Sequence, residues 1–254
     1  DTYLRDYAYQ AAEDTLLATD PRYRNIEWGY MIAQCNQEMA ILAGHTKTVF
    51  TEISHNGAYI LTISADKSAT LWDAEKDTPL YVWNLPDSFA IYGAFSPDDS
   101  KVAIWMYDGK IHYFDTASET PLPSWRAHNL QITGAAFNAS GSRLVSAGED
   151  GSVRVWDTDS HAMVLELETP VAGSAQVAFV DNDNQLFVAP RDGKALLYDG
   201  LTGESLGTTE SAGQVKYIGP ERFAMASDQD LILFSTADMS EIWRTKIFES
   251  PTFV

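Results

Sequence analysis

The sequence predicts an all-β fold in which one small antiparallel sheet is repeated along the chain. The first observation is a strand-end aromatic residue, spaced by 42 residues over four copies and by 36 before the fifth: Trp72, Phe114, Trp156, Tyr198 and Phe234. The second is an aspartate six residues before each of them: Asp66, Asp108, Asp150, Asp192 and Asp228. The third is that short apolar runs alternate with turn residues. This pattern predicts the four-stranded blades of a β-propeller.

The strands of the first repeat illustrate the prediction. Runs at 48–53 and 59–64 flank the turn His55-Asn56-Gly57, and Asn-Gly is a strong hairpin signal. A third strand ends at Trp72-Asp73, and an outer strand follows at 80–84. The five predicted blades cover about 46–84, 88–126, 130–168, 173–209 and 213–247. A run at 39–44 predicts one further outer strand.

Residues 1–37 do not fit the repeat, and we expect them to form a helical segment or linker before a propeller domain at 38–254. Leu4, Ala8, Ala12 and Leu16 recur every four residues, which indicates an amphipathic helix. Pro21 ends this helix, and a second helix contains Cys35. Cys35 is the only cysteine, so an internal disulfide and a cysteine-rich zinc site are excluded.

The composition is strongly acidic, with 36 Asp and Glu against 17 Lys and Arg and a formal net charge of −19. A field of this sign repels phosphates and anionic membranes, so neither nucleic acid nor membrane is an expected partner. It would attract basic partners, or it only keeps the surface soluble.

Targeting signals are not visible in the sequence. No run of about 18 apolar residues and no signal peptide occurs. Since the first residue is Asp1, we expect a processed chain or a piece of a longer protein. The cytoplasm is favoured, and the extracytoplasmic part of a membrane-anchored protein is an alternative.

The repeats resemble WD repeats over about residues 39–247. In that family a His in a Gly-His loop, a Ser or Thr on the second strand, the turn Asp and the strand-end Trp form a hydrogen-bonded set. The first repeat matches it with His45, Ser64, Asp66 and Trp72. The third repeat keeps His128, Asp150 and Trp156, whereas Gly148 replaces the expected hydroxyl. The other repeats keep only the aspartate.

The resemblance also implies a question of ring closure, because seven blades are usual in the family and five are visible. We expect a longer propeller of which this chain is a part; closure by association and irregular closure are alternatives. An open end would expose unpaired strand edges and apolar faces, which favour association.

A second resemblance concerns the segment before the repeats. Residues 23–30, Cys35 and residues 42–45 are similar to the segment that enters the propeller in large bacterial multidomain WD-repeat proteins. Several of those proteins carry a serine/threonine kinase domain upstream.

No catalytic constellation is evident, and we expect no cofactor and no metal. The aspartates before the strand-end aromatic residues repeat at one offset, so a structural turn role is favoured. Residues 181–184 resemble the start of a calcium loop but lack the Gly and distal Glu that such a loop needs.

The candidate partner-binding face consists of residues that adjoin the repeat aspartates: Lys67, Tyr107, Glu149, Arg191 and Gln229. We expect them to surround the central channel of the propeller, where loops on a rigid scaffold carry function. The alternative is a merely solvated rim.

The sequence therefore predicts a non-enzymatic scaffold that binds a protein or peptide within a larger signalling or regulatory protein, and the acidic composition favours a basic peptide. One alternative is a ligand-sensing domain that regulates an upstream enzyme such as a protein kinase. Another is a propeller hydrolase or lyase.

Overall fold

The structure, a computed structural model, describes residues 42–76, 78–85, 88–168, 175–180, 184–190, 193–209, 214–219, 222–226, 230–235 and 237–246. The helices predicted within 1–37 and Cys35 lie outside these residues. The chain divides into two compact units, 1–44 and 45–254. The fold described below belongs to the second unit.

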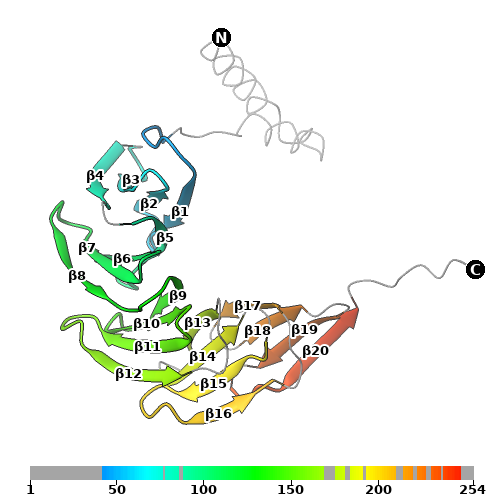
Figure 1. Ribbon diagram of the computed structural model, residues 1–254. Coiled ribbons are helices and arrows are strands. Elements are labelled where there is room, and N and C mark those ends of the chain that lie inside the picture. The colour runs from blue at the N-terminus through cyan, green and yellow to red at the C-terminus, as the bar shows by residue number, and fades with distance from the viewer. Residues whose placement is uncertain are drawn as a thin grey trace, which may run out of the picture. The chain divides into compact units, whose positions relative to one another are not determined.

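The described residues form five four-stranded antiparallel sheets (Figure 1). The first sheet contains β1 (Val49–Ile53), β2 (Tyr59–Ser64), β3 (Ser68–Asp73) and β4 (Thr78–Asn84). The second contains β5 (Ala90–Phe95), β6 (Lys101–Met106), β7 (Lys110–Asp115) and β8 (Pro121–Arg126). The third contains β9 (Ile132–Phe137), β10 (Arg143–Gly148), β11 (Ser152–Asp157) and β12 (Met163–Glu168).

The fourth sheet contains β13 (Ala175–Val180), β14 (Gln185–Pro190), β15 (Leu196–Asp199) and β16 (Ser205–Thr208). The fifth contains β17 (Gln214–Gly219), β18 (Arg222–Ala226), β19 (Asp230–Ser235) and β20 (Glu241–Lys246). Each strand pairs with its neighbours in the chain. The predicted all-β fold of five four-stranded blades is confirmed.

The outer strand of each sheet carries a register shift near the strand-end aromatic residue. In the first sheet Leu71 pairs with Tyr81 but Trp72 pairs with Pro79, so that Leu80 is an extra residue. The third sheet repeats this shift between Val155 and Trp156. An extra residue bends the outer strand and increases its twist.

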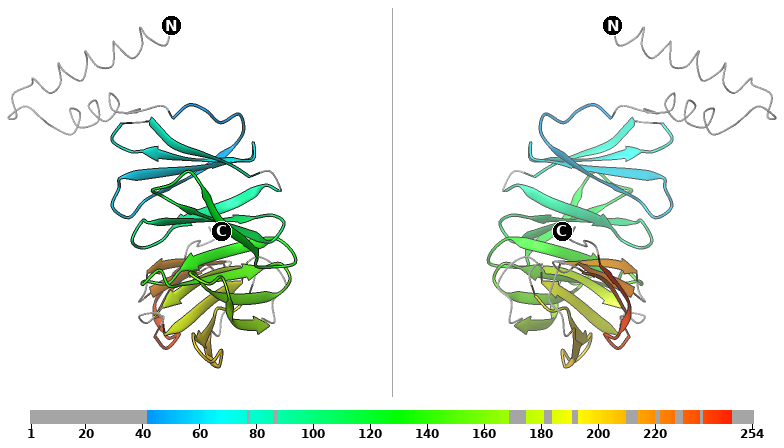
Figure 2. Two further views of the ribbon diagram at one scale, coloured as in Figure 1. Left: turned by 90° about the vertical axis from the view of Figure 1, so that its left-hand side faces the viewer. Right: turned by 90° about the vertical axis from the view of Figure 1, so that its right-hand side faces the viewer.

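Consecutive sheets pack face to face through apolar clusters (Figure 2). The rings of Trp83 in the first sheet and Phe114 in the second stack with centroids 4.3 Å apart. Between the fourth and fifth sheets, the rings of Phe187 and Phe223 pack in a tilted arrangement with centroids 4.5 Å apart. The second strands β6 and β10 are buried on both faces and therefore lack the alternation of apolar and polar residues; β6 has a continuous apolar run, and β10 is interrupted only by the buried Ser146.

In the first four sheets an aspartate follows the strand-end aromatic residue and organises the next turn. The Oδ1 atom of Asp73 accepts hydrogen bonds from the N–H groups of Glu75 and Lys76 at 3.0 and 3.1 Å. Asp115, Asp157 and Asp199 do the same in the following sheets. The Trp-Asp ending thus joins a packing residue to a turn former.

The outer strand expected at 39–44 is wrong in the part that the structure describes, because residues 42–44 are not in a strand. No helix among the described residues is long and apolar enough to cross a membrane.

Candidate functional site

Two buried polar networks connect a loop, a turn and two strands. In the first network, Thr62 Oγ1 lies 2.8 Å from His45 Nε2 and accepts a hydrogen bond from Trp72 Nε1, also at 2.8 Å. His45 Nδ1 lies 3.3 Å from the carboxylate of Asp66, which also accepts a hydrogen bond from Ser68 Oγ at 2.5 Å. The histidine therefore bridges the turn and the second strand.

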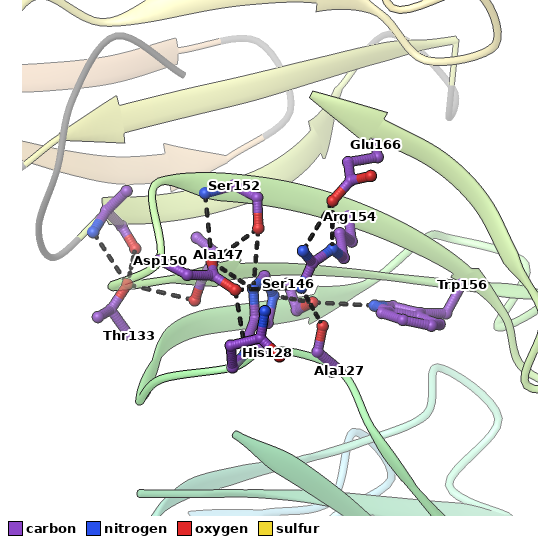
Figure 3. A network of polar contacts seen from close by, with 12 residues as sticks. Ala127, His128, Thr133, Ser146, Ala147, Asp150, Ser152, Arg154, Trp156 and Glu166 are labelled. Atoms are coloured by element: carbon purple, nitrogen blue, oxygen red, sulfur yellow. Dashed lines mark hydrogen bonds and ion pairs between the residues drawn. The ribbon is translucent and has the colours of Figure 1, made fainter. Parts of the chain in front are cut away.

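The second network repeats this arrangement in the third sheet (Figure 3). His128 Nε2 lies 2.8 Å from Ser146 Oγ, which accepts a hydrogen bond from Trp156 Nε1 at 2.9 Å. His128 Nδ1 lies 2.9 Å from Asp150 Oδ1, and Ser152 Oγ donates to the same oxygen at 2.7 Å. His45, Asp66 and Trp72 thus have their counterparts in His128, Asp150 and Trp156.

The prediction that Ser64 supplies the hydroxyl of the first network is wrong. The hydroxyl that links His45 to Trp72 belongs to Thr62. Ser64 Oγ instead accepts a hydrogen bond from Asp66 N at 3.1 Å and lies 3.4 Å from Lys47 O. Both hydroxyls lie on one face of β2, but Ser64 is next to the turn, where the backbone uses it.

The prediction that the third repeat lacks this hydroxyl is also wrong, because the hydroxyl again lies two residues before the expected position. Ser146 supplies the hydroxyl, so the network is complete although Gly148 occupies the position of Ser64. A Cβ atom at Gly148 would overlap the ring of His128. Glycine at this position therefore makes room for the histidine rather than removing a hydroxyl.

One consistent proton order satisfies every donor in the second network. The indole N–H of Trp156 donates to Ser146, the Ser146 hydroxyl donates to His128 Nε2, and His128 Nδ1–H donates to Asp150. This order requires a neutral histidine. Burial lowers the pKa of His128, although the hydrogen bond to Asp150 opposes this effect.

The two turn carboxylates are ionised. Burial alone would raise the pKa of Asp150, but hydrogen bonds from Ser152, Asn129 N–H and His128 hold the pKa well below its usual value. The pKa of Asp66 is lowered against burial by Ser68, Thr46 N–H and His45. A buried carboxylate that accepts several hydrogen bonds prefers its charged form.

Arg154 is a member of the second network that the sequence reasoning missed. Its Nη1 atom donates to Ala127 O at 2.5 Å and to Asp150 Oδ2 at 3.2 Å, and its Nε atom donates to Glu166 at 2.8 Å (Figure 3). The guanidinium thus joins the loop, the turn and the outer strand β12. The corresponding residue in the first repeat, Thr70, gives no signal for this role.

Ser146, His128 and Asp150 have the connectivity of a catalytic Ser-His-carboxylate triad. A nucleophile must reach its substrate, however, and Ser146 and His128 are 0% and 1% exposed. The Ser146 oxygen also accepts the Trp156 N–H. The arrangement is therefore suited to holding the sheet together and not to nucleophilic attack.

Among the residues that the structure describes, no group of three or more His, Cys, Asp or Glu side chains could hold a metal ion.

Three residues of the candidate partner-binding face are described, and all three are exposed: Lys67, Tyr107 and Glu149. Tyr107 and Glu149 occupy equivalent turn positions, because their N–H groups bond to the carbonyls of Phe89 and Gln131. Lys67 differs, since it lies two residues later in its turn, at the position of Gly109 and Gly151. All three of these later residues have positive φ, between 70° and 85°. Arg191 and Gln229 lie outside the described residues, and the arrangement around a central channel stays a prediction.

Comparison with known families agrees with this geometry. Residues 36–73 and 119–157 match the family model described as WD domain, G-beta repeat. Each matched range ends with Trp-Asp and contains one of the two networks. No curated protein matches the chain. The chain thus contains WD repeats in its first and third sheets, and its five four-stranded sheets are blades of the β-propeller class.

Proposed function

We propose that this chain is a non-catalytic scaffold module that binds a protein or peptide through its exposed turns, within a larger signalling or regulatory protein. Matches to WD repeats support the general role, since such repeats generally mediate protein–protein interactions. The observation that carries the proposal is the contrast between buried networks and exposed turns. His128 and Ser146 fix the blade, whereas Tyr107 and Glu149 face solvent from the neighbouring turns.

The partner is a basic segment. The formal net charge of −19 steers basic molecules toward the chain, and Glu149 adds an exposed carboxylate at the candidate face. Because the turns are anchored by the blade framework, the partner binds to a preformed surface with little rearrangement.

A binding experiment with charge-reversed variants tests this proposal. The full chain is immobilised and offered basic and acidic peptide pools of equal length. We expect preferential capture of the basic pool and a reduction by Glu149→Lys. The control, Glu204→Lys, makes the same charge change at the exposed β15–β16 turn. Equal capture of both pools, or an equal loss with both variants, would contradict the proposal.

A further inference from the structure

An apolar surface that the sequence reasoning did not identify lies at the turn of Tyr107 and on the two loops beside this turn. Phe89, Tyr107 and Leu130 are large apolar or aromatic residues, and they are 49%, 58% and 52% exposed. We call these three residues the apolar turn patch. They come from the β4–β5 loop, the β6–β7 turn and the β8–β9 loop.

Backbone contacts bring the three positions together. Tyr107 N donates to Phe89 O at 2.8 Å, which joins the first loop to the turn. The N–H groups of Ala127 and His128 both donate to Gly109 O, at 2.9 and 3.0 Å, which fixes the second loop on the same turn. A Cβ atom at Gly109 would overlap His128 O and approach Leu130 O to 2.6 Å, so this loop lies directly against the turn.

The surroundings of the patch differ in charge at its two ends. At the Phe89 end, Lys67 Nζ lies 5.5 Å from the centre of the phenyl ring. At the Leu130 end, the carbonyl of the next residue, Gln131, accepts a hydrogen bond from Glu149 N at 2.9 Å. The exposed Glu149 therefore lies beside this end of the patch. The patch therefore runs from a cationic side chain to an anionic one.

Hydrogen bonds hold the backbone that carries the apolar turn patch in place. The backbone of Tyr107 is held by its bond to Phe89, and Leu130 follows a loop anchored by the buried His128. Side chains on fixed loops pay little entropy when a partner binds them. Exposed apolar groups that are adjacent and surrounded by polar residues mark interaction sites.

We propose that the apolar turn patch binds an extended protein segment that carries one large apolar side chain followed by a basic side chain. The apolar side chain packs on Phe89, Tyr107 and Leu130, and the basic side chain pairs with Glu149. This inference rests on the proposed scaffold function and specifies the partner of the same face. Charge complementarity with the chain as a whole favours the basic residue.

Three synthetic peptides of equal length and labelling test the proposal by fluorescence anisotropy with the full chain. The first contains a central Leu followed by Lys residues, the second replaces Leu with Ser at the same net charge, and the third replaces Lys with Glu. We expect the first peptide to bind about tenfold more tightly than the second. The third should bind most weakly.

Variants locate the binding site. Phe89→Ala and Leu130→Ser should each weaken binding of the first peptide by about tenfold. Leu201→Ala is the matched control, since Leu201 is 60% exposed on the β15–β16 turn. It should leave binding unchanged. Two patch variants are used so that a folding defect in one, seen as a lowered unfolding midpoint, does not prevent the test.

The outcomes separate this inference from the scaffold proposal. If the Leu and Ser peptides bind equally, or if Leu201→Ala weakens binding as much as the patch variants, the apolar anchor is wrong and a basic partner remains. If the acidic peptide binds as well as the basic ones, the basic preference of the proposed function fails. If no peptide binds, both proposals are overturned.

Discussion

A single hydroxyl determines how each buried network is satisfied. Thr62 and Ser146 both accept an indole N–H and contact a histidine nitrogen. Without this oxygen, the indole N–H and the imidazole nitrogen would both be buried unpaired, and each unpaired group costs about 1–3 kcal/mol. A threonine and a serine serve equally because only the oxygen is used.

Gly148→Ser tests how tightly the second network is packed. The substitution places in the third repeat the residue found at Ser64 in the first, yet its Cβ atom would overlap the ring of His128. We expect a loss of about 1–3 kcal/mol in the free energy of unfolding, as for other overpacked sites. Urea denaturation measures it.

Gly207→Ser is the control, because a Cβ atom there would make only an ordinary contact, 3.4 Å from Met239 Cγ. Equal effects of the two substitutions would show that the space around His128 is not restricted.

At the level of elements, the first and second sheets are joined by a polar contact as well as by apolar packing. Asp99, in the β5–β6 turn, accepts hydrogen bonds from the N–H groups of His55 and Asn56 at 2.8 and 2.9 Å. Those residues form the β1–β2 turn of the preceding sheet. The equivalent residue in the third sheet is Gly141, which has no side chain to make this contact.

Asp99→Gly isolates this contact. Asp99 has a φ of 58°, a conformation that glycine adopts without strain, so the substitution removes the carboxylate and leaves the turn geometry intact. We expect unfolding to be easier by about 1–3 kcal/mol, since two amide groups lose a charged acceptor. Asp99→Asn should cost less, because one oxygen acceptor remains. If Asp99→Gly unfolds at the same urea concentration as the parent chain, the two turns do not stabilise one another.

At the scale of the whole molecule, the buried histidine and the turn carboxylates make stability depend on pH. The pKa values of Asp66, Asp99 and Asp150 are lowered overall; burial opposes this in each, and their hydrogen-bond donors outweigh it. Their stabilisation is present above the unfolded pKa, about 3.9, and is lost as pH falls through the lower folded values. For His128, burial lowers the folded pKa, so the unfolded chain takes up a proton first, below about 6.5.

We therefore expect two stages of acid destabilisation. Urea midpoints should fall as pH decreases below about 6.5, because of His128, and fall more steeply below about 4, because of the aspartates. His128→Gln should have a lower midpoint throughout but a smaller change over the first stage. An unchanged slope in this variant would mean that another group titrates there.

Much of the fold could be predicted from the sequence. The 42-residue spacing located the sheets, and the Asn-Gly and Asp-containing turns located the hairpins. Both signals can be recognised from residue types along the chain, without knowledge of which residues touch. The strand expected at 39–44 was wrong for residues 42–44, since an apolar run becomes a strand only if a neighbouring strand offers its backbone. The apolar turn patch was missed because periodicity does not show which apolar side chains remain uncovered.

The sequence by itself determined the class of the protein: an all-β chain of repeated blades, with Trp-Asp at the strand ends and a strongly acidic composition. Only the tertiary structure decided that Thr62 and Ser146, not Ser64, complete the networks, and that the loops of Phe89 and Leu130 lie against the turn of Tyr107. The physical reason is range. A repeat is visible as recurring residue types without knowing which residues touch, whereas the hydrogen bond between Ser146 and His128 joins residues 18 apart and depends on how a loop lies on its sheet.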